Sequence, residues 1–127
     1  MTALETFRRY AQAFQSLDPV AVARHFHIPS LMITPQGVLA FASGADVEQA
    51  YGRVMADLPA RGYAGTEFSE LVERKLGDDL AAVTGGGAWK TATGEEFSPF
   101  GMTYMFRRAG DTWRIVLAAI HDRGENR

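Results

Sequence analysis

The chain has 127 residues, of which 46% are hydrophobic and 22% charged, and its formal net charge is −2. This length and composition are typical of one globular domain and exclude a disordered or collagen-like chain. The chain has 13 basic and 15 acidic residues, and the basic residues form no stripe along the sequence. A nucleic-acid partner is therefore not expected. The absence of cysteine excludes thiol nucleophiles, disulfides and cysteine-bound metals.

The sequence has no segment typical of a membrane protein. Its longest apolar run, residues 115–120, is far shorter than the about 20 residues that a membrane-spanning helix needs. The N-terminal segment is polar and amphipathic, unlike a secretory signal. We therefore expect a cytoplasmic protein with no membrane partner, folded as one domain over residues 1–122 and followed by a polar tail at 123–127.

The N-terminal half is predicted to begin with two helices. Apolar side chains recur at steps of three and four residues over 4–17, which predicts an amphipathic helix. Thr2 and Glu5 have the spacing of a capping box at its start. Asp18 followed by Pro19 predicts the N-cap and first position of a second helix. We expect that helix to run through 22–26 and to end at residue 29.

A hairpin and a third helix are predicted next. Residues 31–33 and 38–41 flank the turn at 35–37 and are predicted to form a β-hairpin. Apolar residues at helical spacing follow from Ser43, and Pro59 marks the expected end of this third helix.

The second half of the chain alternates with a period of two and predicts four strands, at 63–76, 80–90, 97–107 and 112–121. Short turns join them, so consecutive strands are expected to be antiparallel neighbours. Helices would then cover one face of the sheet in an α+β architecture. The glycines at 85–87 indicate a bend that curves the sheet into a cone with one open mouth.

Two stretches carry a resemblance to the nuclear transport factor 2-like superfamily, which includes ketosteroid isomerase, limonene epoxide hydrolase and the SnoaL-like polyketide cyclases. They are residues 9–26 and residues 107–115, and the resemblance extends over 4–122. It implies a cone-shaped α+β barrel, in which a curved antiparallel sheet of about six strands wraps around three helices from the N-terminal half. The superfamily contains enzymes, binding modules and assembly domains, so the resemblance leaves the function open.

A comparison with ketosteroid isomerase argues against that activity. The resemblance places Tyr10 at the position of the isomerase's tyrosine donor, Thr34 at that of its catalytic base, and Met102 at that of its protonated acid. A threonine hydroxyl is no base near neutral pH, and a thioether cannot donate a hydrogen bond. The acidic set of the epoxide hydrolases is not found at inward-facing positions either.

His121 and Tyr10 are the candidate catalytic residues. Strand alternation counted from Trp113 and Ile115 places His121 on the cavity face, where it could carry a proton while Tyr10 donates a hydrogen bond. The alternative for His121 is a ring that bonds a backbone carbonyl at the sheet edge. The alternative for Tyr10 is a core aromatic.

Apolar and aromatic residues are predicted to line a pocket for a flat hydrophobic small-molecule ligand. The candidate ligand-binding residues are Phe14, Thr34, Tyr51, Met55, Trp89, Phe100, Met102 and Tyr104. His25 and His27 could suggest a metal site, but helical residues two apart point in nearly opposite directions. We therefore expect no metal and no cofactor.

The other face of the sheet is predicted to bind a second copy of the chain. Thr103, Met105, Val116, Ala118 and Ile120 would form an apolar convex patch, which a homodimer would cover. Two functions remain open. One is acid–base catalysis of isomerase, cyclase or hydrolase type on a carbonyl-containing ligand, and the other is a non-catalytic ligand-binding or dimeric assembly module.

Overall fold

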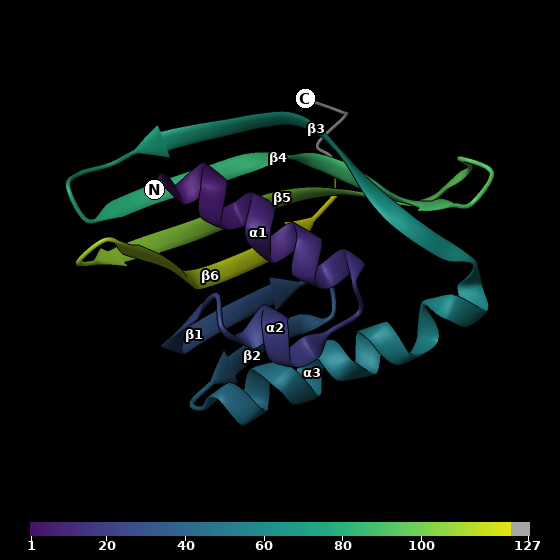
Figure 1. The fold of residues 1–127 in the computed structure, drawn as a ribbon, viewed down its shortest axis with the longest axis horizontal. Helices are drawn as coiled ribbons and strands as arrows, with labels where there is room; N and C mark the ends of the chain where they lie inside the picture. The colour runs from purple at the N-terminus through teal and green to yellow at the C-terminus, as the bar shows by residue number, and fades with distance from the viewer. Residues whose placement is uncertain (123–127) are drawn as a thin grey trace.

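The computed structural model of the chain describes residues 1–122 and shows helices packed on one face of a curved sheet (Figure 1). The predicted polar tail at 123–127 lies outside the described residues. The helices are α1 (Ala3–Gln15), α2 (Pro19–Ala23) and α3 (Gly44–Asp57), and a short 3-10 helix, η1 (Pro59–Arg61), follows α3.

Each of the three α-helices begins at a polar cap. At the start of α1, the Thr2 hydroxyl accepts a hydrogen bond from the Glu5 amide at 3.0 Å, and the Glu5 carboxylate accepts one from the Thr2 amide at 2.8 Å. This pair is the predicted capping box. Asp18 caps α2 and Ser43 caps α3 through their side-chain oxygens, because such oxygens satisfy amides that lack a helical partner.

Six strands form one sheet within the described part of the chain, in the order β2-β1-β6-β5-β4-β3. The strands are β1 (Phe26–Thr34), β2 (Gly37–Phe41), β3 (Tyr63–Lys75), β4 (Leu80–Thr91), β5 (Glu96–Ala109) and β6 (Thr112–His121). The pairing of β1 with β6 is parallel and the others are antiparallel. The sheet is therefore mixed, where we predicted an antiparallel one. No short turn joins β1 to β6, so turn geometry does not fix their relative direction.

The second helix is shorter than predicted. It ends at Ala23, and Phe26, expected inside the helix, is the first residue of β1. Phe26 pairs with Ile115 of β6, and the Ile115 amide donates a hydrogen bond to the His25 carbonyl at 2.8 Å. Pairing with the sheet thus replaces the helical turn that the local pattern favours. Pro29 lies within β1 and does not end a helix.

A β-bulge interrupts the alternation of β6. Ile115 pairs with Phe106 and Leu117 pairs with Met105, so Val116 is an extra residue with no partner of its own on β5. Because successive strand residues point to opposite faces, one extra residue reverses the faces of all residues that follow it.

The bulge corrects the predicted convex patch. Ala118 is fully buried and Ile120 faces the interior, whereas both were predicted to lie on the outer face. Leu117 and Ala119 take the outward positions instead, opposite Met105 and Thr103. The convex side therefore stays apolar, but with a different set of residues from β6.

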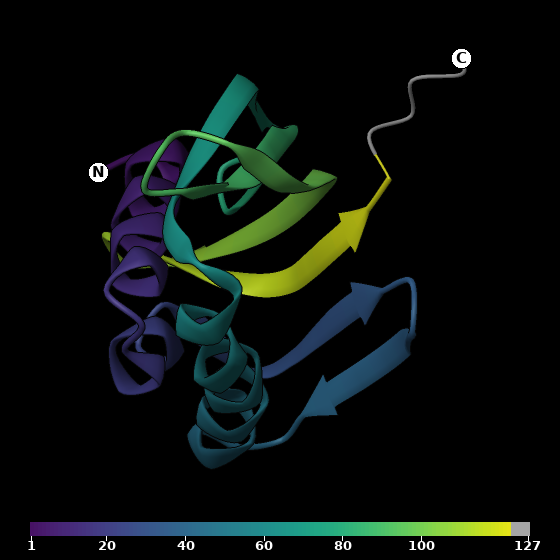
Figure 2. The same cartoon turned by 90° about the vertical axis from the view of Figure 1, so that its right-hand side faces the viewer.

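The core lies between the helices and the concave face of the sheet. Figure 2 shows α1, α2 and α3 together on one side of the curved sheet, with the hairpin of β1 and β2 at its far end. The largest fully buried side chains are Phe7, Phe106, Leu58, Met102, Ile115, Val22, Val47 and Val83. No helix among residues 1–122 is long and apolar enough to span a membrane.

The glycines of β4 allow a close approach by β3. The register of β3 against β4 shifts between Ser69 and Val72, directly opposite Gly85. A Cβ atom at Gly85 would lie 3.0 Å from the Ser69 carbonyl oxygen and 3.0 Å from a methyl group of Leu71. Gly85 therefore leaves room for the bulged segment, as expected of glycine inside a strand.

We predict opposite effects for two glycine-to-alanine substitutions. Gly85→Ala should lower the free energy of unfolding by about 1–3 kcal/mol, because its methyl group overpacks against backbone. Gly52→Ala is the matched control, since Gly52 lies in α3 and a Cβ atom added there would have no neighbour within 4 Å. It should raise stability by up to about 1 kcal/mol. Urea unfolding measures both, and equal effects would contradict the close packing at Gly85.

Candidate functional site

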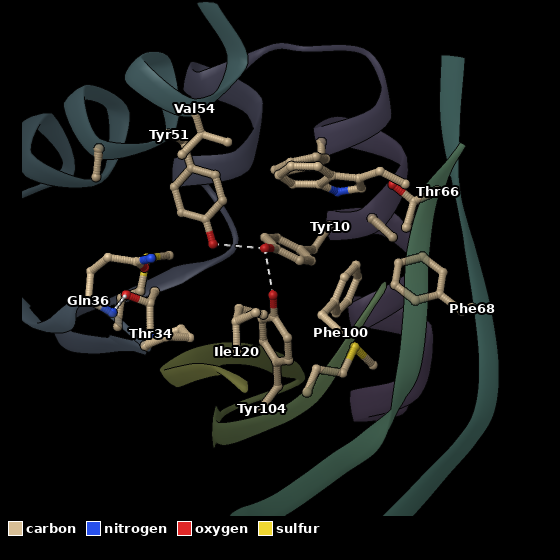
Figure 3. Close-up of a pocket in the computed structure, with 17 residues that line it drawn as sticks. Tyr10, Thr34, Gln36, Tyr51, Val54, Thr66, Phe68, Phe100, Tyr104 and Ile120 are labelled. Atoms are coloured by element: carbon tan, nitrogen blue, oxygen red, sulfur yellow. Dashed lines mark hydrogen bonds between the residues drawn. The ribbon is translucent and has the colours of Figure 1, made fainter. Parts of the chain in front are cut away.

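The cone encloses a cavity of about 270 Å³ between α1, α3 and the sheet (Figure 3). Tyr10 lines it, together with seven of the eight predicted ligand-binding residues, which are Phe14, Thr34, Tyr51, Trp89, Phe100, Met102 and Tyr104. The remaining lining residues were not predicted from the sequence, and they are Ala11, Met32, Pro35, Gln36, Ala50, Val54, Thr66, Phe68 and Ile120.

Some of these missed residues could have been found from sequence periodicity. Thr66 and Phe68 alternate along β3, while Ala50 and Val54 follow the helical spacing of α3 around Tyr51. Ile120 could not have been found, because the bulge in β6 reverses its direction. The alternation rule holds only as far as the first bulge.

Met55 was predicted to bind ligand, but it belongs to the hydrophobic core. Its side chain is 5% exposed and does not line the cavity. Met55 lies one helical turn after Tyr51 in α3, so both residues share a buried face. That face extends beyond the cavity, and Met55 packs in the part that is filled with side chains.

His121 does not lie at the cavity, and its expected inward orientation is wrong. The ring is exposed on the outer side of β6, where Nδ1 donates to the Asp122 carbonyl at 2.6 Å and Nε2 lies 3.3 Å from the Thr103 hydroxyl. A Cβ at Gly101 would lie 2.7 Å from this ring, so the ring packs against the neighbouring strand. The bulge at Val116 causes the reversal.

The polar centre of the cavity is a chain of three tyrosine hydroxyls. The Tyr10 hydroxyl lies 2.7 Å from that of Tyr51 and 2.8 Å from that of Tyr104, and Figure 3 shows the three meeting between α1, α3 and β5. All three side chains are buried. Each hydroxyl has one proton, and the two hydrogen bonds use two of the three. Whichever way the bonds are directed, one proton stays free to donate to a ligand.

Burial keeps these hydroxyls protonated. Desolvation raises the pKa of Tyr10, Tyr51 and Tyr104 well above the ordinary value of 10.0, because a tyrosinate would lose its hydration inside the apolar cavity. The cluster is therefore a hydrogen-bond donor over the whole physiological pH range and is not a base.

The cavity lining holds no carboxylate, histidine, lysine or arginine among the described residues. Thr34 lines it, and its hydroxyl accepts a hydrogen bond from the backbone amide of Gln36 at 3.2 Å. Met102 lines it as well. At these two positions, where the resemblance to ketosteroid isomerase leads one to expect carboxyl groups, the cavity thus offers a hydroxyl and a thioether. Its chemistry is hydrogen-bond donation without a residue suited to remove a proton.

Aromatic rings form one wall of the cavity. The rings of Phe14 and Trp89 are stacked, with centroids 6.2 Å apart and planes inclined by 20°. The guanidinium of Arg61 lies 5.7 Å from the centre of the Trp89 ring system. Such a wall presents flat apolar surface to a ligand. His25 and His27 take no part in it, and no cluster of three potential metal ligands occurs in residues 1–122.

One known protein family matches nearly the whole chain. Residues 2–123 match the family described as NTF2-like protein (DUF6841), and the chain belongs to that family. No curated protein matches the chain.

Solved structures with the same fold are similar over most of the chain. An NTF2-like protein with a cystatin-like fold from Novosphingobium aromaticivorans is 17% identical with a TM-score of 0.76, and the match covers 95% of this chain and 79% of the other. An NTF2-like protein of unknown function from Shewanella oneidensis is 13% identical with a TM-score of 0.71, covering 94% and 95%. At such identities the similarity establishes the fold alone.

We predict that the three buried tyrosines make the protein sensitive to alkaline pH. Their hydroxyls ionise near pH 10 in the unfolded chain but stay protonated in the folded one. Their contribution to the free energy of unfolding is therefore fully present below pH 10 and is lost as pH rises above it. Each tyrosine contributes a slope of at most about 1.4 kcal/mol per pH unit. Urea unfolding between pH 8 and 11 should show a steeper loss for the natural chain than for a variant with Phe at all three positions. Parallel curves would contradict the assignment.

Proposed function

We propose that this protein binds a small, flat hydrophobic ligand that carries a hydrogen-bond acceptor such as a ketone carbonyl. The observation that carries the proposal is the free tyrosine proton in a mainly apolar cavity. An unpaired donor in an apolar site favours a ligand that supplies an acceptor over one that does not. The stacked Phe14 and Trp89 rings suit a planar ligand skeleton.

The size of the cavity limits the ligand. Its volume of about 270 Å³ lies just below the range of about 300–1,000 Å³ that is usual for ligand pockets. A skeleton of one or two rings therefore fits this space better than a steroid-sized one.

The proposal favours binding over acid–base catalysis. Isomerase, cyclase and hydrolase reactions of this type need a group that removes a proton, and the described lining contains no carboxylate, histidine or lysine that would do so. His121 is exposed and does not line the cavity, so it is not positioned to serve as that group. Tyr10 keeps its proposed role as a hydrogen-bond donor. The expectations of a cytoplasmic location and of no cofactor stay predictions from the sequence.

The ligand class can be tested with two probes of the same shape. We expect 2-acetylnaphthalene to bind more tightly than 2-ethylnaphthalene by about two- to tenfold, the value of one net hydrogen bond. A variant with Phe at positions 10, 51 and 104 should lose this preference. It removes all three hydroxyls together and so leaves no buried group unpaired. Tryptophan fluorescence or calorimetric titration measures the affinities, and equal binding of the two probes to the natural chain would refute the proposal.

A cavity-filling variant tests where the probe binds. Ala50→Leu adds bulk at the cavity wall, whereas Ala56→Leu adds the same bulk at an exposed position of α3. Only the first should weaken binding of 2-acetylnaphthalene, by about tenfold or more, because the leucine side chain takes space that the rings of the probe would otherwise fill with apolar contact. Equal affinities of the two variants would place the probe outside the cavity.

We also propose that the protein forms a homodimer through the convex face of the sheet. Leu31, Ile33 and Val38 are 41%, 37% and 63% exposed on adjacent strands of this face. Leu117 and Ala119 of β6 pair with the first two of them and continue the apolar surface. A continuous apolar surface on adjacent strands favours an interface, and a second copy presents the same surface about a two-fold axis.

Sedimentation velocity tests the dimer. The natural chain should sediment as a dimer at micromolar concentration, and Leu31→Glu should shift it to monomer because it places charge inside the contact. Val20→Glu is the control, since Val20 is equally apolar and exposed but lies on α2, on the helical side. A natural chain that is monomeric at this concentration would rule the dimer out.

A further inference from the structure

A second hollow lies beside the cavity, in the groove between α1 and β3. It measures about 540 Å³ and shares Ala11, Thr66 and Phe68 with the cavity lining. Figure 3 shows Thr66 and Phe68 on the side of the cavity opposite Thr34 and Gln36. The same side chains thus face both spaces, and the groove adjoins the cavity on that side.

Ala11 lies in the wall that the two spaces share. At 3.6 residues per turn, Tyr10 and Phe14 of α1 face the cavity, while Arg8 and Gln12 face the groove. Ala11 lies between these two faces of the helix. A methyl group there leaves space next to Thr66 and Phe68 that a longer side chain would fill.

The two spaces differ in chemistry. The cavity is lined mainly by apolar and aromatic side chains, whereas the groove presents Arg8, Gln12, Gln15 and Ser16 along its α1 side. The ion pairs found within the described part of the chain are those of Lys90 with Glu67 and of Arg108 with Asp79. Neither engages Arg8, whose guanidinium is therefore available to an anionic group in the groove.

We propose that the natural ligand is an amphiphile with an acidic tail. Its ring and carbonyl occupy the cavity, its chain passes Ala11, and a carboxylate at the end of the chain pairs with Arg8 in the groove. The inference rests on the proposed function and adds to it the class of ligand. Arg8 is then a specificity-determining residue that distinguishes an acid from a neutral molecule of the same shape.

Three probes test this assignment in low-salt buffer. They are 2-acetylnaphthalene, 6-(2-naphthyl)-6-oxohexanoate and the primary amide of that acid. We expect the acid to bind about two- to fivefold more tightly than the amide, the range for an exposed ion pair, and we expect added salt to reduce the difference. Arg8→Gln should abolish the difference. Arg9→Gln should retain it, because Arg9 is an exposed neighbour that lines neither space.

The outcomes separate the two proposals. If 2-acetylnaphthalene binds but the acid and the amide bind alike, or if both arginine variants lose the preference equally, the acidic tail is refuted and the ketone pocket stands. If 2-acetylnaphthalene does not bind, both proposals fall.

The path of the tail can be tested because the natural chain has no cysteine. Gln12→Cys places a single thiol in the groove, and Gln49→Cys places one on the exposed surface of α3. A naphthyl ketone with a chloroacetamide at the end of its chain should alkylate the first thiol at least several-fold faster, and excess 2-acetylnaphthalene should slow that reaction. Equal rates at the two positions would overturn the proposed path.

Discussion

The contact of the Tyr10 hydroxyl with the hydroxyls of Tyr51 and Tyr104 joins the three parts of the structure that make the cavity. It connects α1, α3 and β5 at one point inside an apolar interior. A buried hydroxyl left without a partner costs more than the net value of one hydrogen bond. The relative positions of helices and sheet are thus coupled to the cluster of hydroxyls that the cavity offers a ligand. Fold and site depend on the same atoms.

Much of the fold follows from local sequence rules. The caps at Thr2, Asp18 and Ser43 and the strands of the second half lie where composition and periodicity predict them. Local rules do not predict the pairing of β1 with β6. This pairing joins segments more than 80 positions apart and ends α2 early. Tertiary pairing overrides a helical preference that is worth only tenths of a kcal/mol per residue.

The site was predictable in its residues but not in its connections. The aromatic positions of α1, α3 and β5 that line the cavity follow from periodicity, whereas hydrogen bonds between residues 41 and 94 positions apart do not. For His121, in contrast, the predicted direction of the side chain is wrong. Its direction follows from alternation only if β6 is regular, and a single extra residue at Val116 breaks that condition. His121 is excluded as the base by the direction of its side chain and not by the chemistry of its imidazole.

The bulge in β6 has a consequence for how this family can change. Residues 115–120 are all apolar, so moving the bulge to another position within this run would bury no polar group and meets little resistance from the sequence. Moving the bulge beyond residue 118 would turn Leu117 toward the helices in place of Ala118, and the space near Tyr104 would shrink by several methyl groups. Strand register is thus a means of resizing the interior that leaves the amino-acid composition of the strand untouched.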